Sequence, residues 1–362
     1  MKSLYQKSLQ ILIENQSKEG AFIACPNFKT YQYAWFRDGS FCAHALAQAG
    51  YNPNAACFHD WASQIVLRYQ PKIKASIGEI RAGRMPLAAM CFHSRFTLDG
   101  HEVPGHWGYH QLDGLGTWLW ALAEFHRMNS HSVLPEAWTQ AAALAGEYLA
   151  TMWAYPCSDC WEENETKIHT YTLAAIYAGL KGCAALLNDA AAETAAEAVR
   201  AFIFQNCVEE GAFIKSIGIP GVDGNLLGLC EPYHLVEWRD PVFQKTVSQI
   251  RADLATPTGI HRYRADTYYG SGEWLLLTDW LGWNLAQAGE TDAARSILAW
   301  TEAQATPTGE LPEQAPHALY NEKAYDQWEQ RWGPIASPLL WSHAMYILLA
   351  RSIEERTRTE QG

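Results

Sequence analysis

The chain has 362 residues, of which 48% are hydrophobic and 18% charged, and its formal net charge is −12. This composition is typical of a folded globular protein and unlike that of a disordered one. The excess of acidic residues would repel a nucleic-acid backbone or an anionic membrane surface. Polar residues or glycine break every apolar run before it reaches the roughly 18–20 residues that cross a bilayer. We therefore expect no nucleic-acid and no membrane partner.

The spacing of apolar residues predicts a mostly helical chain. Intervals of three and four residues indicate helices over 2–17, 38–50, 54–69, 111–128, 135–153, 169–187, 190–206, 239–253, 271–288, 291–304 and 335–356, with a shorter one near 224–232. Strand patterns are short and occur around 211–214 and 262–263. The long connections are 18–37, 70–110, 154–168, 207–223, 254–270 and 305–334, and functional residues are usually found in such loops. About twelve helices without a flexible linker predict one domain over 1–362. A bundle, an open superhelix and a closed ring of six hairpins all fit the periodicity.

The cysteine and histidine patterns argue against a metal or cofactor site. Nine cysteines are scattered along the chain, which suits reduced thiols, and the lone Cys157 and Cys160 pair lacks the second pair of a structural zinc site. Residues 1–17 lack the continuous apolar segment of a secretory signal. Gly270-Ser271-Gly272 lacks the lysine and the strand context of a nucleotide loop. We expect free thiols, no metal, no cofactor and a cytoplasmic location.

Four histidines lie in loops that could border a binding pocket: His106, His110, His169 and His317. A ring nitrogen there could bond a ligand hydroxyl, but buried histidines more often satisfy neighbouring backbone groups. We expect structural roles for them.

Aromatic residues are unusually frequent, with 16 Trp, 17 Tyr and 12 Phe. Indole faces pack well against the C–H groups of a sugar ring, although a large hydrophobic core explains the same composition. Their positions beside charged residues are more informative.

Two acidic clusters fall in the predicted long loops. Trp161-Glu162-Glu163 precedes the helix predicted at 169–187, and Glu313 lies in Leu311-Pro312-Glu313-Gln314. A carboxyl group shielded by an indole can hold a proton near neutral pH and act as a general acid, while a second carboxylate activates water. Taken alone, glutamates before a helix more often interact with its dipole.

Two further clusters combine arginine, aspartate and aromatic side chains. Tyr31, Trp35, Arg37 and Asp38 lie just before and within the start of one predicted helix, and the segment from Arg262 to Trp274 repeats the same residue types. Such residues commonly serve as helix caps and surface ion pairs. A carboxylate beside a guanidinium can also bind adjacent hydroxyl groups of one sugar ring.

Together these segments resemble glycoside hydrolase family 15, the glucoamylase-like enzymes. The resemblance follows the family's order, from Tyr31–Asp38 through Trp161–Glu163 and Arg262–Trp274 to Leu311–Gln314, and includes 111–114 and 338–344. It implies an all-α (α/α)6 barrel and an inverting mechanism. Because the first predicted helix starts near residue 2, we expect no N-terminal β-sandwich. The small isomaltose-hydrolysing branch of the family is the most similar in type.

The resemblance also implies a role for each matched residue. Glu162 would be the general acid and Glu313 the general base. The substrate-binding residues would be Tyr31, Trp35, Arg37, Asp38, Trp161, Glu163, Arg262 and Trp274. The expected reaction releases β-glucose from the non-reducing end of short α-gluco-oligosaccharides, with α-1,6 favoured over α-1,4 and trehalose-type linkages. A non-catalytic sugar-binding or regulatory domain on the same barrel is the alternative.

Overall fold

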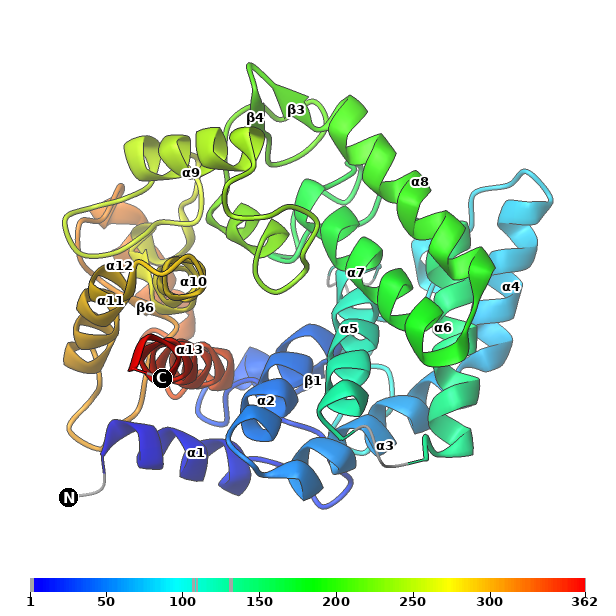
Figure 1. Cartoon of the computed structure of the whole chain (residues 1–362), viewed down its shortest axis with the longest axis horizontal. Helices are drawn as coiled ribbons and strands as arrows, with labels where there is room; N and C mark the ends of the chain where they lie inside the picture. Colours follow the sequence, from blue (N-terminus) through cyan, green and yellow to red (C-terminus); the bar gives the residue numbers. More distant parts are fainter. Residues whose placement is uncertain (1–2, 106–107, 109, 130–132, 362) are drawn as a thin grey trace.

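The computed structural model describes residues 3–105, 108, 110–129 and 133–361. Viewed along its axis, the molecule is a ring of helices in two layers (Figure 1). The inner layer consists of α2 (Phe36–Gln48), α5 (Asp113–Met128), α7 (Thr170–Leu187), η3 (Gly224–Leu229), α10 (Leu275–Gln287) and α13 (Leu340–Gln361). The outer layer consists of α1 (Leu4–Glu14), α3 (Asn52–Arg68), α6 (Glu136–Met152), α8 (Ala190–Asn206), α9 (Pro241–Asp253) and α11 (Thr291–Ala303). Each inner element contacts the next, and α13 contacts α2, so the ring closes. The predicted (α/α)6 barrel is confirmed.

The inner helix α10 is apolar on nearly all sides. In α10 every residue from Leu275 to Ala286 is buried, as is expected of a helix surrounded by other helices. By length and composition α7 could also cross a membrane, but 72% of it is buried inside the barrel. Its apolar character is therefore explained by its place in the core.

Two glycines let α5 and α7 approach each other unusually closely. A Cβ atom on Gly116 would lie 2.4 Å from the carbonyl oxygen of Ala175, and one on Gly179 would lie 2.6 Å from that of Gly116. The obstructing atoms belong to the backbone, so they cannot rotate away. This contact between two inner helices therefore requires glycine.

Two helices lie in segments that we expected to be loops. They are α4 (Gln70–Arg81) within 70–110 and α12 (Glu322–Trp332) within 305–334. Only Ile73, Ser76 and Ile77 are buried in α4, and only Ala324 in α12. Apolar residues nevertheless repeat at three- and four-residue intervals in both helices, as Ile73, Ile77 and Ile80 in α4 and Tyr325, Trp328 and Trp332 in α12. The sequence therefore carried a helical signal in both segments that the prediction missed. The short helix expected near 224–232 is the 3₁₀ helix η3.

The strands form three two-stranded antiparallel sheets. They are β1 (Ala34–Trp35) with β2 (Arg95–Phe96), β3 (Val208–Glu209) with β4 (Ala212–Phe213), and β5 (Glu273–Trp274) with β6 (Gln314–Ala315). The described residues contain no larger sheet and no β-sandwich. The strand expected at 211–214 is present as β4. The strand expected at 262–263 is wrong, because these residues lie in a loop that carries the buried Arg262.

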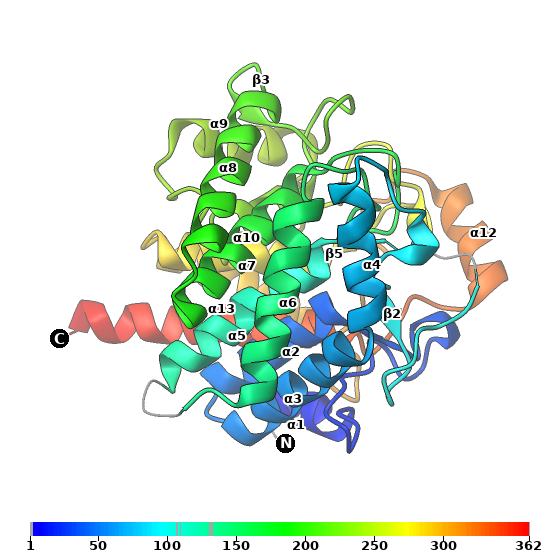
Figure 2. The same cartoon turned by 90° about the vertical axis from the view of Figure 1, so that its right-hand side faces the viewer.

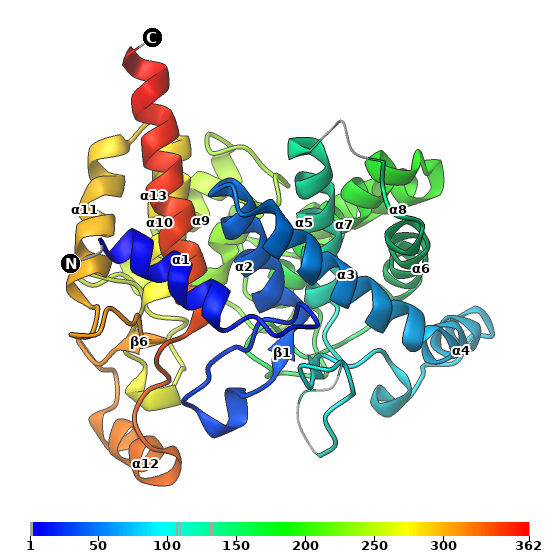
Figure 3. The ribbon, with the colours of Figure 1, turned by 90° about the horizontal axis from the view of Figure 1, so that it is seen from below.

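The loops that carry the expected site residues lie at one end of the barrel. Figure 2 shows β2, β5 and α12 on one side of the molecule and the C-terminal end of α13 on the other. Figure 3, from below, shows β1, β6 and α12 together at the same end. The inner helices α2, α5, α10 and α13 begin here, so the residues at their N-termini surround one opening.

Candidate active site

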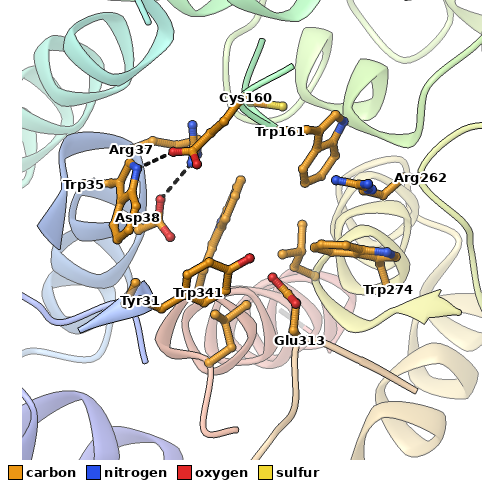
Figure 4. Close-up of a pocket in the computed structure, with 14 residues that line it drawn as sticks. Tyr31, Trp35, Arg37, Asp38, Cys160, Trp161, Arg262, Trp274, Glu313 and Trp341 are labelled. Atoms are coloured by element: carbon orange, nitrogen blue, oxygen red, sulfur yellow. Dashed lines mark hydrogen bonds and ion pairs between the residues drawn. The ribbon is translucent and has the colours of Figure 1, made fainter. Parts of the chain in front are cut away.

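An inner cavity of about 70 Å³ lies at this end of the barrel. All but one of the expected site residues line it: Tyr31, Trp35, Arg37, Asp38, Trp161, Glu162, Arg262, Trp274 and Glu313. They come from η1 (Lys29–Tyr31), β1, the start of α2, β5 and three separate loops. Figure 4 shows Glu313 pointing into the cavity on one side, with Arg37 and Asp38 opposite. The fold thus brings distant segments to one enclosed space.

A larger outer cavity of about 650 Å³ adjoins the inner one and shares Tyr31, Trp161, Glu162 and Arg262 with it. The remaining expected residue, Glu163, lines this outer cavity. Side chains of α12 also border it, among them Trp328, Arg331 and Trp332. The three glutamates therefore occupy successive depths, with Glu313 in the inner cavity, Glu162 at the junction and Glu163 outside.

Arg37 is held by buried acceptors at the bottom of the inner cavity. Its Nη1 donates to Asp113 Oδ2 at 3.0 Å and to Gln111 Oε1 at 3.1 Å, and its Nη2 lies 3.2 Å from Asp38 Oδ2. The guanidinium also lies over the ring of Trp341, 5.1 Å from the centroid. Burial raises the pKa of Asp38, although Arg37 opposes this effect. Two adjacent polar groups with fixed orientations thus line the cavity.

The loop after α6 presents Glu162 through a tight turn. Asp159 Oδ1 accepts hydrogen bonds from the backbone N–H groups of Trp161 and Glu163, at 3.0 and 2.9 Å. Glu162 has a left-handed backbone conformation, with φ 69°, which costs a non-glycine residue roughly 1–2 kcal/mol. Its Oε1 accepts from Trp35 Nε1 at 2.5 Å and from Gln111 Nε2 at 3.1 Å. Backbone and side chain of Glu162 are thus fixed by neighbours.

A buried lysine lies beneath this loop. Lys215 Nζ is 2.5 Å from Asp223 Oδ2 and 3.2 Å from Asp159 Oδ2. Asp223 Oδ2 also accepts from Trp161 Nε1 at 2.9 Å. Burial opposes the ionisation of Asp159, but Lys215, His169 and hydrogen bonds together outweigh it, so the pKa of this carboxyl is lowered. We call Asp159, Lys215 and Asp223 the lysine cluster; it fixes the loop that carries Glu162 and Glu163.

Glu313 directly precedes β6 and is 4% exposed. Its backbone N–H donates to Ala336 O at 2.9 Å. Burial raises the pKa of Glu313 to about 8, while Arg262 and the hydroxyls of Tyr31 and Tyr268 favour the ionised form. These two hydroxyls are hydrogen bonded to each other at 2.9 Å. The higher pKa makes the carboxylate a stronger base than an ordinary glutamate, and it lowers the ionised fraction at neutral pH.

Arg262 connects the walls of both cavities. Its Nε donates to Asp266 Oδ2 at 2.9 Å, and its Nη2 lies 3.4 Å from Glu163 Oε1. The guanidinium also lies 5.1 Å from the ring centroid of Trp161 and 4.9 Å from that of Trp274. Burial raises the pKa of Glu163, partly offset by Arg262.

The comparisons with known proteins agree with this geometry. The family model described as glycosyl hydrolases family 15 matches residues 1–351. The chain belongs to this family. It is 37% identical to the isomaltose glucohydrolase of Kribbella flavida over 96% of its own length and 91% of that protein. A solved glycosidase in complex with glucose superposes with a TM-score of 0.93 at 36% identity, over 97% of this chain and 96% of that one.

A glucoamylase from Saccharomycopsis fibuligera has the same fold at 15% identity, with a TM-score of 0.74 over 98% of this chain and 94% of that one. The family model and the 37% identical relative thus show a glycoside hydrolase, and this structural neighbour shows the (α/α)6 barrel.

Sequence reasoning did not assign several residues of this family 15 site. Trp341 lines the inner cavity, Tyr268 the outer one, and Gln111 and Asp113 hold Arg37. All four belong to segments that matched the family, namely 111–114, 262–274 and 338–344, so the signal was present although no role was assigned. Lys215 belongs to no segment that resembled the family.

The histidines and cysteines near the site differ in their surroundings. His169 bonds Ser216 Oγ at 2.6 Å and Cys157 O at 2.8 Å, so its expected structural role is confirmed. His110 is buried, and His317 lies 3.6 Å from Glu273 Oε2. His106 lies outside the described residues. Cys157 and Cys160 are both free and buried, and Cys160 also lines the inner cavity.

Proposed function

We propose that this chain is an exo-acting, inverting α-glucoside hydrolase. It releases β-glucose from the non-reducing end of short α-gluco-oligosaccharides and prefers the α-1,6 linkage of isomaltose. The observation that carries the proposal is the order of Glu313, Glu162 and Glu163 along the two cavities. A terminal sugar ring in the inner cavity would place its glycosidic bond at the junction, beside Glu162.

In this proposal Glu162 and Glu313 act on opposite sides of the bound ring. Glu162 gives its proton to the glycosidic oxygen as the bond to C1 breaks. Glu313 takes a proton from the water that attacks C1 from the other face, so the configuration is inverted. The hydroxyl of Tyr31, close to Glu313, orients this water. The acid and the base each contribute roughly 10²- to 10⁴-fold to the rate.

The inner cavity's size and its polar end support exo action. Arg37 and Asp38 lie where they can bind adjacent hydroxyls of a terminal glucose. Trp35, Trp161 and Trp274 form the walls. Glu163, which accepts a hydrogen bond from Tyr263, faces the leaving sugar in the outer cavity.

The proposed preference for the α-1,6 linkage is based on similarity to a known relative. Identity of 37% to an isomaltose glucohydrolase over nearly the whole chain supports an α-1,6 substrate. The alternatives are α-1,4 and α,α-1,1 linkages. Glucose release from isomaltose, maltose, trehalose, kojibiose and nigerose, measured side by side, tests this choice. We expect isomaltose to have the highest kcat/KM and NMR to detect β-glucose first. Initial α-glucose would contradict inversion, and activity on none of the five would favour a non-catalytic sugar-binding domain.

Matched glutamine variants test the two catalytic assignments. We expect Glu162→Gln and Glu313→Gln each to lower kcat at least 10²-fold while the protein stays folded, as judged by circular dichroism. Glu209→Gln is the control, because Glu209 is exposed and is not among the residues that line either cavity. We expect its kcat within about threefold of the wild type, since it contacts no reacting atom. A near-normal rate in either catalytic variant would contradict its role.

We also propose a cytoplasmic location. All nine cysteines are free, and all except Cys57 are buried, which suits a reducing compartment. Detection of the protein in the culture medium of intact cells of its source, with a cytoplasmic marker retained, would contradict the proposal.

A further inference from the structure

Another cavity, partly open to solvent, lies at the end of the barrel away from the active site. It has a volume of about 210 Å³, compared with about 70 Å³ for the inner catalytic cavity. Its walls come from the C-terminal halves of α2, α5, α10 and α13 and from residues 231–234. The N-terminal ends of these same helices border the active site. We call this space the rear cavity.

One inner element next to the rear cavity is short. The other inner helices have at least 13 residues, whereas η3 has six. Glu231, Pro232 and His234, which follow η3 in the chain, line the rear cavity. A second cavity of about 440 Å³ adjoins the rear cavity and shares Trp120, Glu124, Arg127 and His234 with it.

Core aromatic rings separate the rear cavity from the catalytic one. The ring of Phe41 lies 5.4 Å from that of Trp341, which borders the catalytic cavity. On its other side, Phe41 lies 5.9 Å from Trp120, which borders the rear cavity. Phe41 and Trp280 are both fully buried. The two cavities are thus distinct sites.

Three aromatic side chains line the rear cavity. The ring of His44 lies 4.7 Å from that of Trp120 and 6.5 Å from that of Trp283. All three side chains are at least nine-tenths buried. Among the described residues, His44 Nδ1 and Trp120 Nε1 have no hydrogen-bond partner. Buried polar atoms normally have a hydrogen-bond partner, so we expect a bound molecule to supply one for these two nitrogens.

The other polar groups suit a neutral ligand rather than an ion. Carboxyl groups of Glu124, Glu231 and Glu355 line the rear cavity together with the guanidinium groups of Arg127 and Arg351. Arg127 is paired with Glu124, and Arg351 lies 3.4 Å from Glu355. The remaining carboxyl, Glu231, is 14% exposed, and His234 Nδ1 lies 3.9 Å from it. Burial raises the pKa of Glu231 to about 8, so near pH 7 this group is mostly protonated and able to donate a hydrogen bond.

We propose that the rear cavity is a second carbohydrate site, which binds one neutral pyranose ring against Trp120 and Trp283. Indole faces cover the C–H groups of a pyranose, and Glu231, His44 and the indole N–H of Trp120 bond its hydroxyls. The adjoining cavity gives space for a further sugar or a substituent. The inference stands independently of the proposed catalytic reaction.

The test follows leucine methyl resonances by NMR while the full chain is titrated with D-glucose. Leu348 lines the rear cavity, and Leu276 and Leu339 line the catalytic one, so the two sites have separate reporters. Gln48 is a partly exposed lining residue of the rear cavity, outside the catalytic machinery. Gln48→Trp places an indole in the cavity, and Gln48→Ala is the matched variant that keeps it open.

We expect the Leu348 methyl shifts to saturate with glucose in the wild type and in Gln48→Ala, and to change at least fivefold less in Gln48→Trp. The shifts of Leu276 and Leu339 should remain in all three proteins, which also shows that Gln48→Trp is folded. An unresponsive Leu348 in the wild type would overturn the proposal. So would an undiminished response in Gln48→Trp, because the shift would then be transmitted from the catalytic cavity. A response to inorganic phosphate and not to glucose would identify an anion site instead.

Discussion

Replacement of Lys215 by methionine tests whether the lysine cluster stabilises the acid loop. Lys215 is 5% exposed, and its partners Asp159 and Asp223 are 3% and 0% exposed at their side chains. Removing one partner of a buried ion pair leaves uncompensated charge and costs about 3–5 kcal/mol. Here one ammonium serves two carboxylates, and each carboxylate keeps other N–H donors, which limits the loss. We therefore expect Lys215→Met to lower the free energy of unfolding by about 3–5 kcal/mol.

The control is a lysine with the same pairing on the surface. Lys181 also bridges two carboxylates, Glu193 and Glu197, but it is 38% exposed. Exposed pairs contribute about 0–1 kcal/mol, so Lys181→Met should have little effect on urea unfolding. A loss of less than 1 kcal/mol in Lys215→Met, equal to that of the control, would refute this account of the cluster.

The same variant should impair catalysis in the protein that remains folded. Asp159 fixes the turn that carries Glu162, and a displacement of about 1 Å at a reacting group can cost roughly 10²-fold. We expect kcat of Lys215→Met, measured well below its unfolding midpoint, to fall about 10- to 100-fold. Combining it with Asp223→Asn removes one uncompensated charge, so the double variant should be more stable than the sum of the single losses predicts. Unchanged kcat in folded Lys215→Met would show that the cluster stabilises the fold without positioning the loop.

The described geometry predicts four further outcomes. Glu313 must be ionised to act as a base, and burial raises its pKa to about 8. The value of kcat/KM should therefore fall about tenfold per pH unit below pH 8. If the acid limb of the pH profile of kcat/KM were centred near pH 5, this expectation would be wrong. Tyr31→Phe removes a hydroxyl that favours ionised Glu313, so the acid limb should move to higher pH, and an unmoved limb would show that this hydroxyl has no such effect. The folded state holds the Glu313 proton more tightly than the unfolded state does, so Glu313→Gln should raise stability at pH 9 relative to the wild type and have less effect at pH 4, as thermal unfolding at the two values can test. Gly116→Ala places a methyl group 2.4 Å from Ala175 O and should lower the free energy of unfolding by at least about 1–3 kcal/mol. Its control is Gly78→Ala, whose methyl group has nothing within 4 Å and should raise the free energy of unfolding by up to about 1 kcal/mol. Equal urea midpoints of the two variants would contradict the close approach of α5 and α7.

The sequence by itself predicted the inner and outer helices, because a helix packed in this barrel has an apolar stripe that repeats at the helical period. The prediction missed α4 and α12, which rest on the surface with few buried residues, although their apolar residues also follow the helical period. The strand expected at 262–263 was wrong because Arg262 is buried by the site, not by a sheet.

The order of segments also predicted the residues around the catalytic cavity, which the fold brings together from one end of the barrel. Only the tertiary structure decided that Glu162 lies between two cavities, that burial raises the pKa of Glu313, and that Lys215 holds the loop. The rear cavity likewise is formed by residues of four inner helices and of the segment after η3. Local sequence patterns specify helices and motifs. The depth of a side chain in a cavity, the pairing of buried charges and the cavities themselves arise from contacts between segments far apart in the chain.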